Sequence, residues 1–193
     1  TSAIRLAADA DAGSAILRIT GDGSSVSSEY LLAGYLSTSS SSAYAVVDLA
    51  DGATIQSNEI YLREGSTLSG QGTLTGLDGV ALTGPTRLQA DLSDIRPGDI
   101  YNVQTNEFSR EIGVLTVDGD LFSTDTTLWV DAKGATSDLL DVTGKWTFSG
   151  LTEWRVDVSP DPNDPDPDQF LVAQANEIIT DSDADFVVYV NGQ

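Results

Sequence analysis

The sequence predicts an all-β protein whose strands wind into a right-handed parallel β-helix, with a β-sandwich as the alternative fold. Many short runs alternate apolar and polar residues at a spacing of two, which is the strand period. Glycine, aspartate, serine and threonine separate these runs where turns are expected. A weak internal repeat also recurs at an offset of 29 to 31 residues, which favours the β-helix.

The alternation is clearest between residues 112 and 158. Leu115 and Val117 share one face of a short strand, and Leu128 and Val130 share one face of another. The same spacing of two recurs further along in Leu140 and Val142, in Trp146 and Phe148, and in Trp154, Val156 and Val158. This stretch therefore predicts a series of short strands with no helical segment.

The repeat relates residues 14–34 to residues 43–65. In each copy an alternating pair is followed by a turn glycine, a returning apolar residue and an apolar run that ends at a second glycine. One such coil cannot bury its own inward face, so the coils are expected to stack. If the repeat is accidental, the β-sandwich becomes the better interpretation.

The chain is expected to form one domain over residues 1–193. An excursion from the coil is expected within 88–110, where Arg96-Pro97-Gly98-Asp99 forms a turn. Residues 160–168 read PDPNDPDPD and predict an acidic loop, because proline has no amide to donate to a sheet. Both ends are strand-like, at residues 3–7 and 186–190.

Composition excludes several classes of function. The chain has no His, Cys or Met, so triads with His and metal sites based on His or Cys are excluded. Thirty acidic residues against nine basic ones give a net charge of −21, which would repel the phosphates of nucleic acid and anionic membranes. No apolar run approaches the roughly 20 residues of a membrane helix, so no membrane insertion is expected.

Two groups of carboxylates could bind calcium, which prefers oxygen ligands. The first is Asp164, Asp166 and Asp168, which alternate with prolines. The second is Asp181, Asp183 and Asp185. The alternative for both is a solvated acidic loop, and no other cofactor is expected.

Two aromatic residues are candidates for glycan binding. Trp129 lies out of phase with the inward Leu128 and Val130, and Tyr61 lies between the inward Ile60 and Leu62. Aromatic rings on an outer sheet face can stack on sugars. The alternative is that each ring shields a neighbouring strand. Trp146 and Trp154 are in phase with inward residues and are expected in the core.

Several motifs carry a family resemblance. They are GSTLSGQGTLTG from Gly65, IGVLTVDGDL from Ile112 and SDLLDVTGKWTFSGL from Ser137. These segments resemble the β-helical passenger region of autotransporters and of autotransporter-associated or PEP-CTERM-type bacterial surface proteins. The resemblance implies a parallel β-helix that is exported, surface-associated and usually without catalytic activity. No membrane barrel or sorting tail follows in this sequence.

We therefore expect a non-enzymatic structural protein, secreted or on a bacterial cell surface, that acts as an adhesin or as a filament or matrix subunit. The strand Phe186, Val187, Val188, Tyr189 and Val190 is expected to add to the sheet of another copy by end-to-end β-augmentation. The alternatives are a glycan-binding module and, more distantly, a lyase or hydrolase of acidic polysaccharides. The seven arginines are scattered through the sequence and form no motif of such an enzyme.

Overall fold

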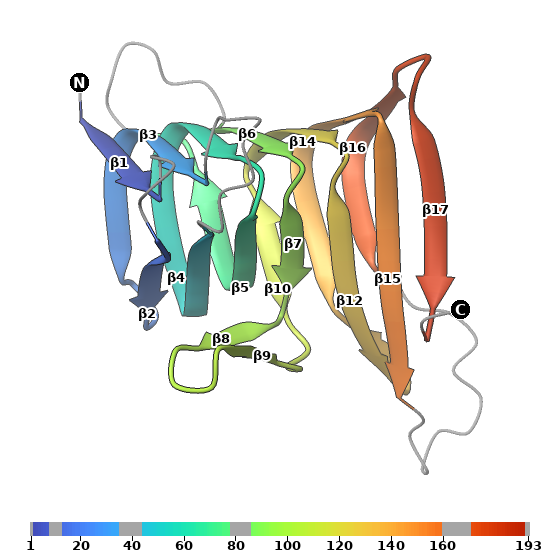
Figure 1. The fold of residues 1–193 in the computed structure, drawn as a ribbon, viewed down its shortest axis with the longest axis horizontal. Helices are drawn as coiled ribbons and strands as arrows, with labels where there is room; N and C mark the ends of the chain where they lie inside the picture. Colours follow the sequence, from blue (N-terminus) through green and yellow to red (C-terminus); the bar gives the residue numbers. More distant parts are fainter. Residues whose placement is uncertain (1, 8–12, 35–43, 78–85, 160–170, 192–193) are drawn as a thin grey trace.

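The computed structural model describes residues 2–7, 13–34, 44–77, 86–159 and 171–191 (Figure 1). Within these ranges the regular secondary structure is entirely β. The strands are β1 (Ala3–Leu6), β2 (Ala15–Thr20), β3 (Ser25–Ala33), β4 (Ala45–Leu62), β5 (Ser66–Thr75), β6 (Thr86–Asp91), β7 (Asp94–Pro97), β8 (Ile100–Asn102), β9 (Glu107–Ser109), β10 (Val114–Val117), β11 (Gly119–Thr124), β12 (Thr127–Lys133), β13 (Thr136–Ser137), β14 (Leu139–Ser149), β15 (Leu151–Ser159), β16 (Ala173–Thr180) and β17 (Asp185–Val190).

Fifteen strands form one sheet that winds around a common axis (Figure 1). Apart from the short β13, each pairs in parallel with strands of the neighbouring coils, which produces three faces. Face A contains β2, the first part of β4, the first part of β5, β7, β12, β15 and β17. Face B contains the first part of β3, the middle of β4, the second part of β5, β10 and the first parts of β14 and β16. Face C contains β1, the ends of β3 and β4, β6, β11 and the ends of β14 and β16.

This arrangement confirms the predicted β-helix, in preference to the β-sandwich. The sequence repeat corresponds to one coil of the stack. Ala15 pairs with Ala45 and Tyr30 pairs with Glu59, so adjacent coils are offset by 30 and 29 residues at these positions. Pairing in register aligns equivalent side chains from coil to coil, so each inward position forms a column along the axis.

One such column runs across face C. It consists of Leu31, Ile60, Leu88, Leu121 and Trp146, each paired with the next in register. All five are at most 2% exposed. Burial of a large aliphatic or aromatic side chain contributes about 1.5–3 kcal/mol, so these columns provide most of the stabilisation of the fold.

Corners of the coil need unusual backbone conformations. Between faces C and A, Leu92, Asp125 and Gly150 all have positive φ, at 48°, 48° and 62°. They follow equivalent strands on successive coils, and the amide of Leu92 donates to the Thr124 carbonyl at 3.0 Å. Between faces A and B, a Cβ at Gly70 would lie 1.8 Å from the Leu49 carbonyl oxygen, so only glycine fits that corner.

The excursion expected within 88–110 is a shorter insertion. β6 and β7 belong to the coil, and the inserted part is the antiparallel hairpin of β8 and β9, which pairs Ile100–Asn102 with Glu107–Ser109. The hairpin lies against face A at a buried carboxylate, Asp48. This carboxylate accepts hydrogen bonds from Ser69 Oγ (2.7 Å), Arg18 Nε (2.7 Å) and the amide of Tyr101 in β8 (3.3 Å). Buried charge needs such partners, so Asp48 fastens the hairpin to the solenoid.

The described residues include no helix that is long and apolar enough to cross a membrane.

Adjacent leucines in β14 provide a test of the inward columns. Leu140 is fully buried, whereas its neighbour Leu139 points outward and is half-buried. We expect Leu140→Ala to lower the free energy of unfolding by about 2–5 kcal/mol through lost burial and a cavity. Leu139→Ala, the matched control, should cost clearly less. Urea unfolding measures both, and equal losses would contradict the orientation of β14.

Candidate functional site

A groove of about 700 Å³ lies on the outside of face A, between the hairpin and the last three strands of that face. Its walls come from β7, β9, β12, β15 and β17 and from the residues that follow them. The polar and aromatic lining residues are Arg96, Asp99, Glu107, Phe108, Arg110, Trp129, Asp131, Arg155, Asp157, Tyr189 and Asn191. This volume is typical of clefts that bind small molecules.

Arginine and aromatic side chains alternate along the floor of the groove. The Arg96 guanidinium lies 4.5 Å from the Phe108 ring centre and 4.2 Å from the Trp129 ring centre. The Arg155 guanidinium lies 4.8 Å from the Trp129 ring centre and 5.6 Å from the Tyr189 ring centre. We call these five residues the arginine–aromatic ladder.

The register of face A produces this ladder. Trp129 pairs with Arg155, and Arg155 pairs with Tyr189, so the three side chains leave the sheet at the same position on successive strands. Strands lie about 4.8 Å apart, which is the separation at which a planar guanidinium stacks on a ring. The two arginines come from the strands on either side of β12, so Trp129 lies between their guanidiniums.

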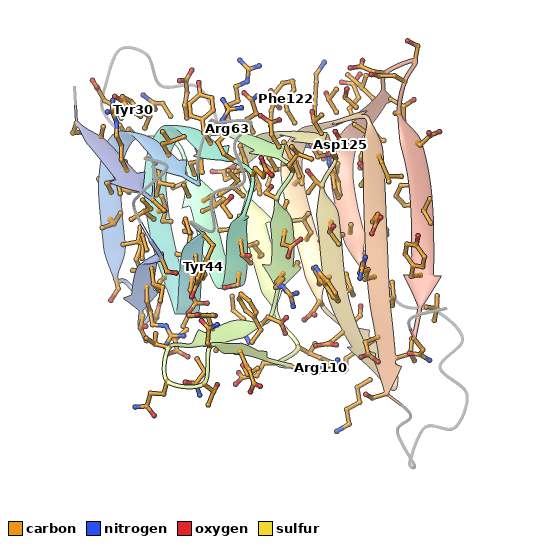
Figure 2. All side chains as sticks on the ribbon, viewed as in Figure 1. Tyr30, Tyr44, Arg63, Arg110, Phe122 and Asp125 are labelled. Atoms are coloured by element: carbon orange, nitrogen blue, oxygen red, sulfur yellow. The ribbon has the colours of Figure 1, made fainter. Side chains whose placement is uncertain are left out.

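Each guanidinium of the groove also has a carboxylate partner. Arg96 lies 3.3 Å from Asp99 Oδ2, and Arg155 lies 2.9 Å from Glu153 Oε2. Arg110, which follows β9 and is labelled in Figure 2, pairs with Asp157 of β15. These pairs place hydrogen-bond donors and acceptors side by side with little net charge.

Three neighbouring carboxyl groups have raised pKa values, and two of them, Asp99 and Asp131, line the groove. Burial, together with the nearby Asp131, raises the pKa of Asp99 to about 7. Burial also raises the pKa of Asp138 to about 7, against the lowering effect of the Asp131 and Gly113 amides that donate to it. The pKa of Asp131 is likewise raised by burial. Asp99 and Asp138 therefore hold a proton to a higher pH than an exposed aspartate does.

The aromatic residues predicted for glycan binding lie on different faces. Trp129 lies in the groove, as part of the ladder. Tyr61 points outward from face C, where its hydroxyl donates to Glu59 at 2.8 Å and Arg63 stacks on its ring. Trp146 is buried as predicted, and Trp154 is partly buried against the core.

Only one of the two predicted groups of calcium ligands lies within the described residues. Asp164, Asp166 and Asp168 lie outside the described residues. Asp181 and Asp183 lie in the exposed turn before β17, and Asp185 is the first residue of that strand. Among the residues that the structure describes, no three or more carboxylates are grouped so that they could hold a metal ion.

Sequence reasoning missed most of the groove. Arg96 and Arg155 are far apart in the chain, and they meet at Trp129 only after the coils are aligned. The sequence did hold one signal for the two arginines. Each comes directly after an inward residue, Ile95 or Trp154, and should therefore point outward, just as Trp129 does after Leu128. Phe108 and Arg110 gave no such signal, because they come from the inserted hairpin and the residues after it.

Comparisons with protein-family models, with curated proteins and with solved structures found no match. The resemblance to autotransporter passenger regions therefore remains an expectation based on the sequence motifs.

The raised pKa of Asp99 makes stability depend on pH. Between about pH 4 and about pH 7, the folded state keeps a proton that the unfolded chain has released. The free energy of unfolding should therefore fall as the pH rises through this window and level off above it. Asp99→Asn cannot ionise, so we expect it to flatten this dependence in urea unfolding measured across the window.

Asp183→Asn is the control, because it removes an exposed carboxylate from the turn before β17. Asp138 remains in both variants. The Asp99 charge helps to raise the pKa of Asp138, so Asp99→Asn also lowers that pKa and flattens the profile further. An Asp99→Asn profile as steep as that of the unmodified chain would show that Asp99 ionises freely in the folded state.

Proposed function

We propose that this protein is a structural subunit, secreted or displayed on a bacterial cell surface, that associates end to end with copies of itself. The observation that carries the proposal is the open core at the C-terminal coil. Phe186, Val188 and Val190 are 53%, 46% and 46% exposed, although they occupy inward columns. Their partners one coil earlier include Thr152 and Val156, which are 1% and 7% exposed.

The open end also has a prearranged apolar surface. Phe186 lies edge-on to Trp154, with ring centres 4.9 Å apart, and to Phe148, at 6.4 Å. Trp146 stacks on both Phe148 and Trp154, at 4.6 Å and 6.0 Å. Ile178 of β16 is 61% exposed at the same end. Exposed apolar residues grouped in this way are typical of interaction surfaces.

Among the described strands, β17 pairs on one side only, with β15. The amides of Asp185 and Asn191 donate to carbonyls of Gly150 and Val156, at 2.8 Å and 2.9 Å. Alternate residues of a parallel strand donate to the same neighbour, so the amides at positions 186, 188 and 190 point to the open side. Unpaired groups of this kind can accept a further strand from another molecule.

The two ends of the solenoid match in strand length on two faces. On face A, β17 and β2 both have six residues. On face C, the last four residues of β16 correspond to the four residues of β1. In Figure 1, β1 and β2 lie at one end of the stack and β16 and β17 at the other. A head-to-tail contact between such ends does not close on itself, so it produces a filament.

A charged side chain in the open core should prevent this association. We expect Val188→Lys to weaken self-association at least about tenfold, because the lysine would be buried without a partner. Val187→Lys is the matched control, since Val187 lies on the same strand but points away from the core. Sedimentation velocity over a range of protein concentrations, with electron microscopy of the products, measures the effect.

Filaments that Val188→Lys abolishes and Val187→Lys retains would support the proposal. Closed dimers would contradict the head-to-tail arrangement. A chain that stays monomeric under all conditions would contradict self-association and indicate that other residues cover the open core.

Salt should promote association, because each subunit carries a net charge of −21. Repulsion between subunits is screened over about 10 Å at 0.1 M ionic strength and over about 3 Å at 1 M. We therefore expect longer assemblies as sodium chloride is raised. Light scattering against salt concentration measures this, and dissociation by salt would show that ion pairs, not the apolar core, hold the subunits together.

A further inference from the structure

The groove on face A is separate from the inward surface that end-to-end association would use. Three of the nine basic residues of the chain line it, together with the acidic residues Asp99, Glu107, Asp131 and Asp157. The proposed association gives this groove no role. We infer that the groove is a binding site for an uncharged, linear polysaccharide.

The groove offers repeated polar contacts along the solenoid axis. One line of outward groups is Trp129, Arg155 and Tyr189, and the neighbouring line places Asp131 opposite Asp157, followed by Asn191. On the second line, a carboxylate or amide group recurs once per strand, about every 4.8 Å. A chain molecule with hydroxyl groups at regular intervals can use the same contact several times, which a compact ligand cannot.

The ion pairs favour a ligand without charge. Arg96, Arg110 and Arg155 each have a carboxylate partner, so an anionic ligand would have to displace these partners and would also meet a strongly negative protein. A sugar hydroxyl both donates and accepts, so it can bind a guanidinium and its carboxylate together without separating them.

Three buried polar atoms of groove-lining residues lack partners. Asp99 Oδ1, Arg96 Nε and Trp129 Nε1 make no hydrogen bond within the described part of the chain. The Asp99 side chain is only 7% exposed, and all three residues line the groove. An unsatisfied buried polar group is unfavourable in the free protein, and a ligand hydroxyl would supply the missing hydrogen-bond partner. This indicates a polar ligand at that wall, beside the ladder.

The ladder defines how the sugar is held. Arginines from the strands on either side stack on the Trp129 ring, so this ring acts as a spacer between two guanidiniums and not as a stacking surface for the ligand. Recognition therefore depends on the guanidiniums and carboxylates, and Arg155, which touches both Trp129 and Tyr189, lies at the centre.

The test compares two arginines in similar surroundings. Arg155 lies in the groove, stacks on Tyr189 and pairs with Glu153. Arg63 lies on face C, stacks on Tyr61 and pairs with Asp91. We expect Arg155→Gln to lower the affinity for the best-bound oligosaccharide at least about tenfold, because it removes charged hydrogen bonds to the ligand. Arg63→Gln should leave the affinity within about twofold.

The probes are soluble oligosaccharides of cellulose, xylan, mannan and starch, with oligogalacturonate as the anionic comparison. Titration calorimetry of the full chain measures binding, and sedimentation of each variant shows whether its assembly state has changed. Binding of a neutral oligosaccharide that Arg155→Gln abolishes and Arg63→Gln preserves would support the inference. It would be overturned if no neutral oligosaccharide bound, if oligogalacturonate bound more tightly, or if both variants lost affinity equally.

Discussion

A single coil cannot enclose its own apolar side chains, and the whole structure depends on neighbouring coils to cover them. Each inward side chain is covered from above and below by its equivalents, as in the column from Leu31 to Trp146. The parallel register that builds these columns also aligns the outward positions. The parallel register that forms the core therefore also brings together the outward side chains of the groove.

The same constraint explains why the two ends of the molecule differ from its middle. Interior coils have a neighbour on both sides, whereas β17 has one among the described strands. The inward residues of β17 are apolar, as in a core, but their side chains are exposed to solvent. The cost of this exposure is the physical basis of the proposed association, and the high negative charge opposes it at long range.

The fold could be predicted from the sequence because it depends on patterns among residues close together in the chain. A spacing of two identified the inward residues of β10, β12 and β14, and the repeat identified one coil. The site could not be predicted in the same way. Trp129 was found from its phase, but Arg96 and Arg155 reach it only through the alignment of strands some 26 to 33 residues apart. Lateral neighbours depend on register, which a single sequence specifies only weakly where the repeat is irregular.

The hairpin of β8 and β9 has a consequence for how such a molecule can change. It enters after β7 and returns before β10, so it interrupts a corner of the coil and no strand of it. The stack beneath it would keep its registers if the hairpin were exchanged for another loop, provided that Asp48 kept a donor in place of the Tyr101 amide. The architecture thus separates the solenoid from a hairpin that can be exchanged. The side chains on one side of the groove can therefore change while the length and width of the solenoid stay constant.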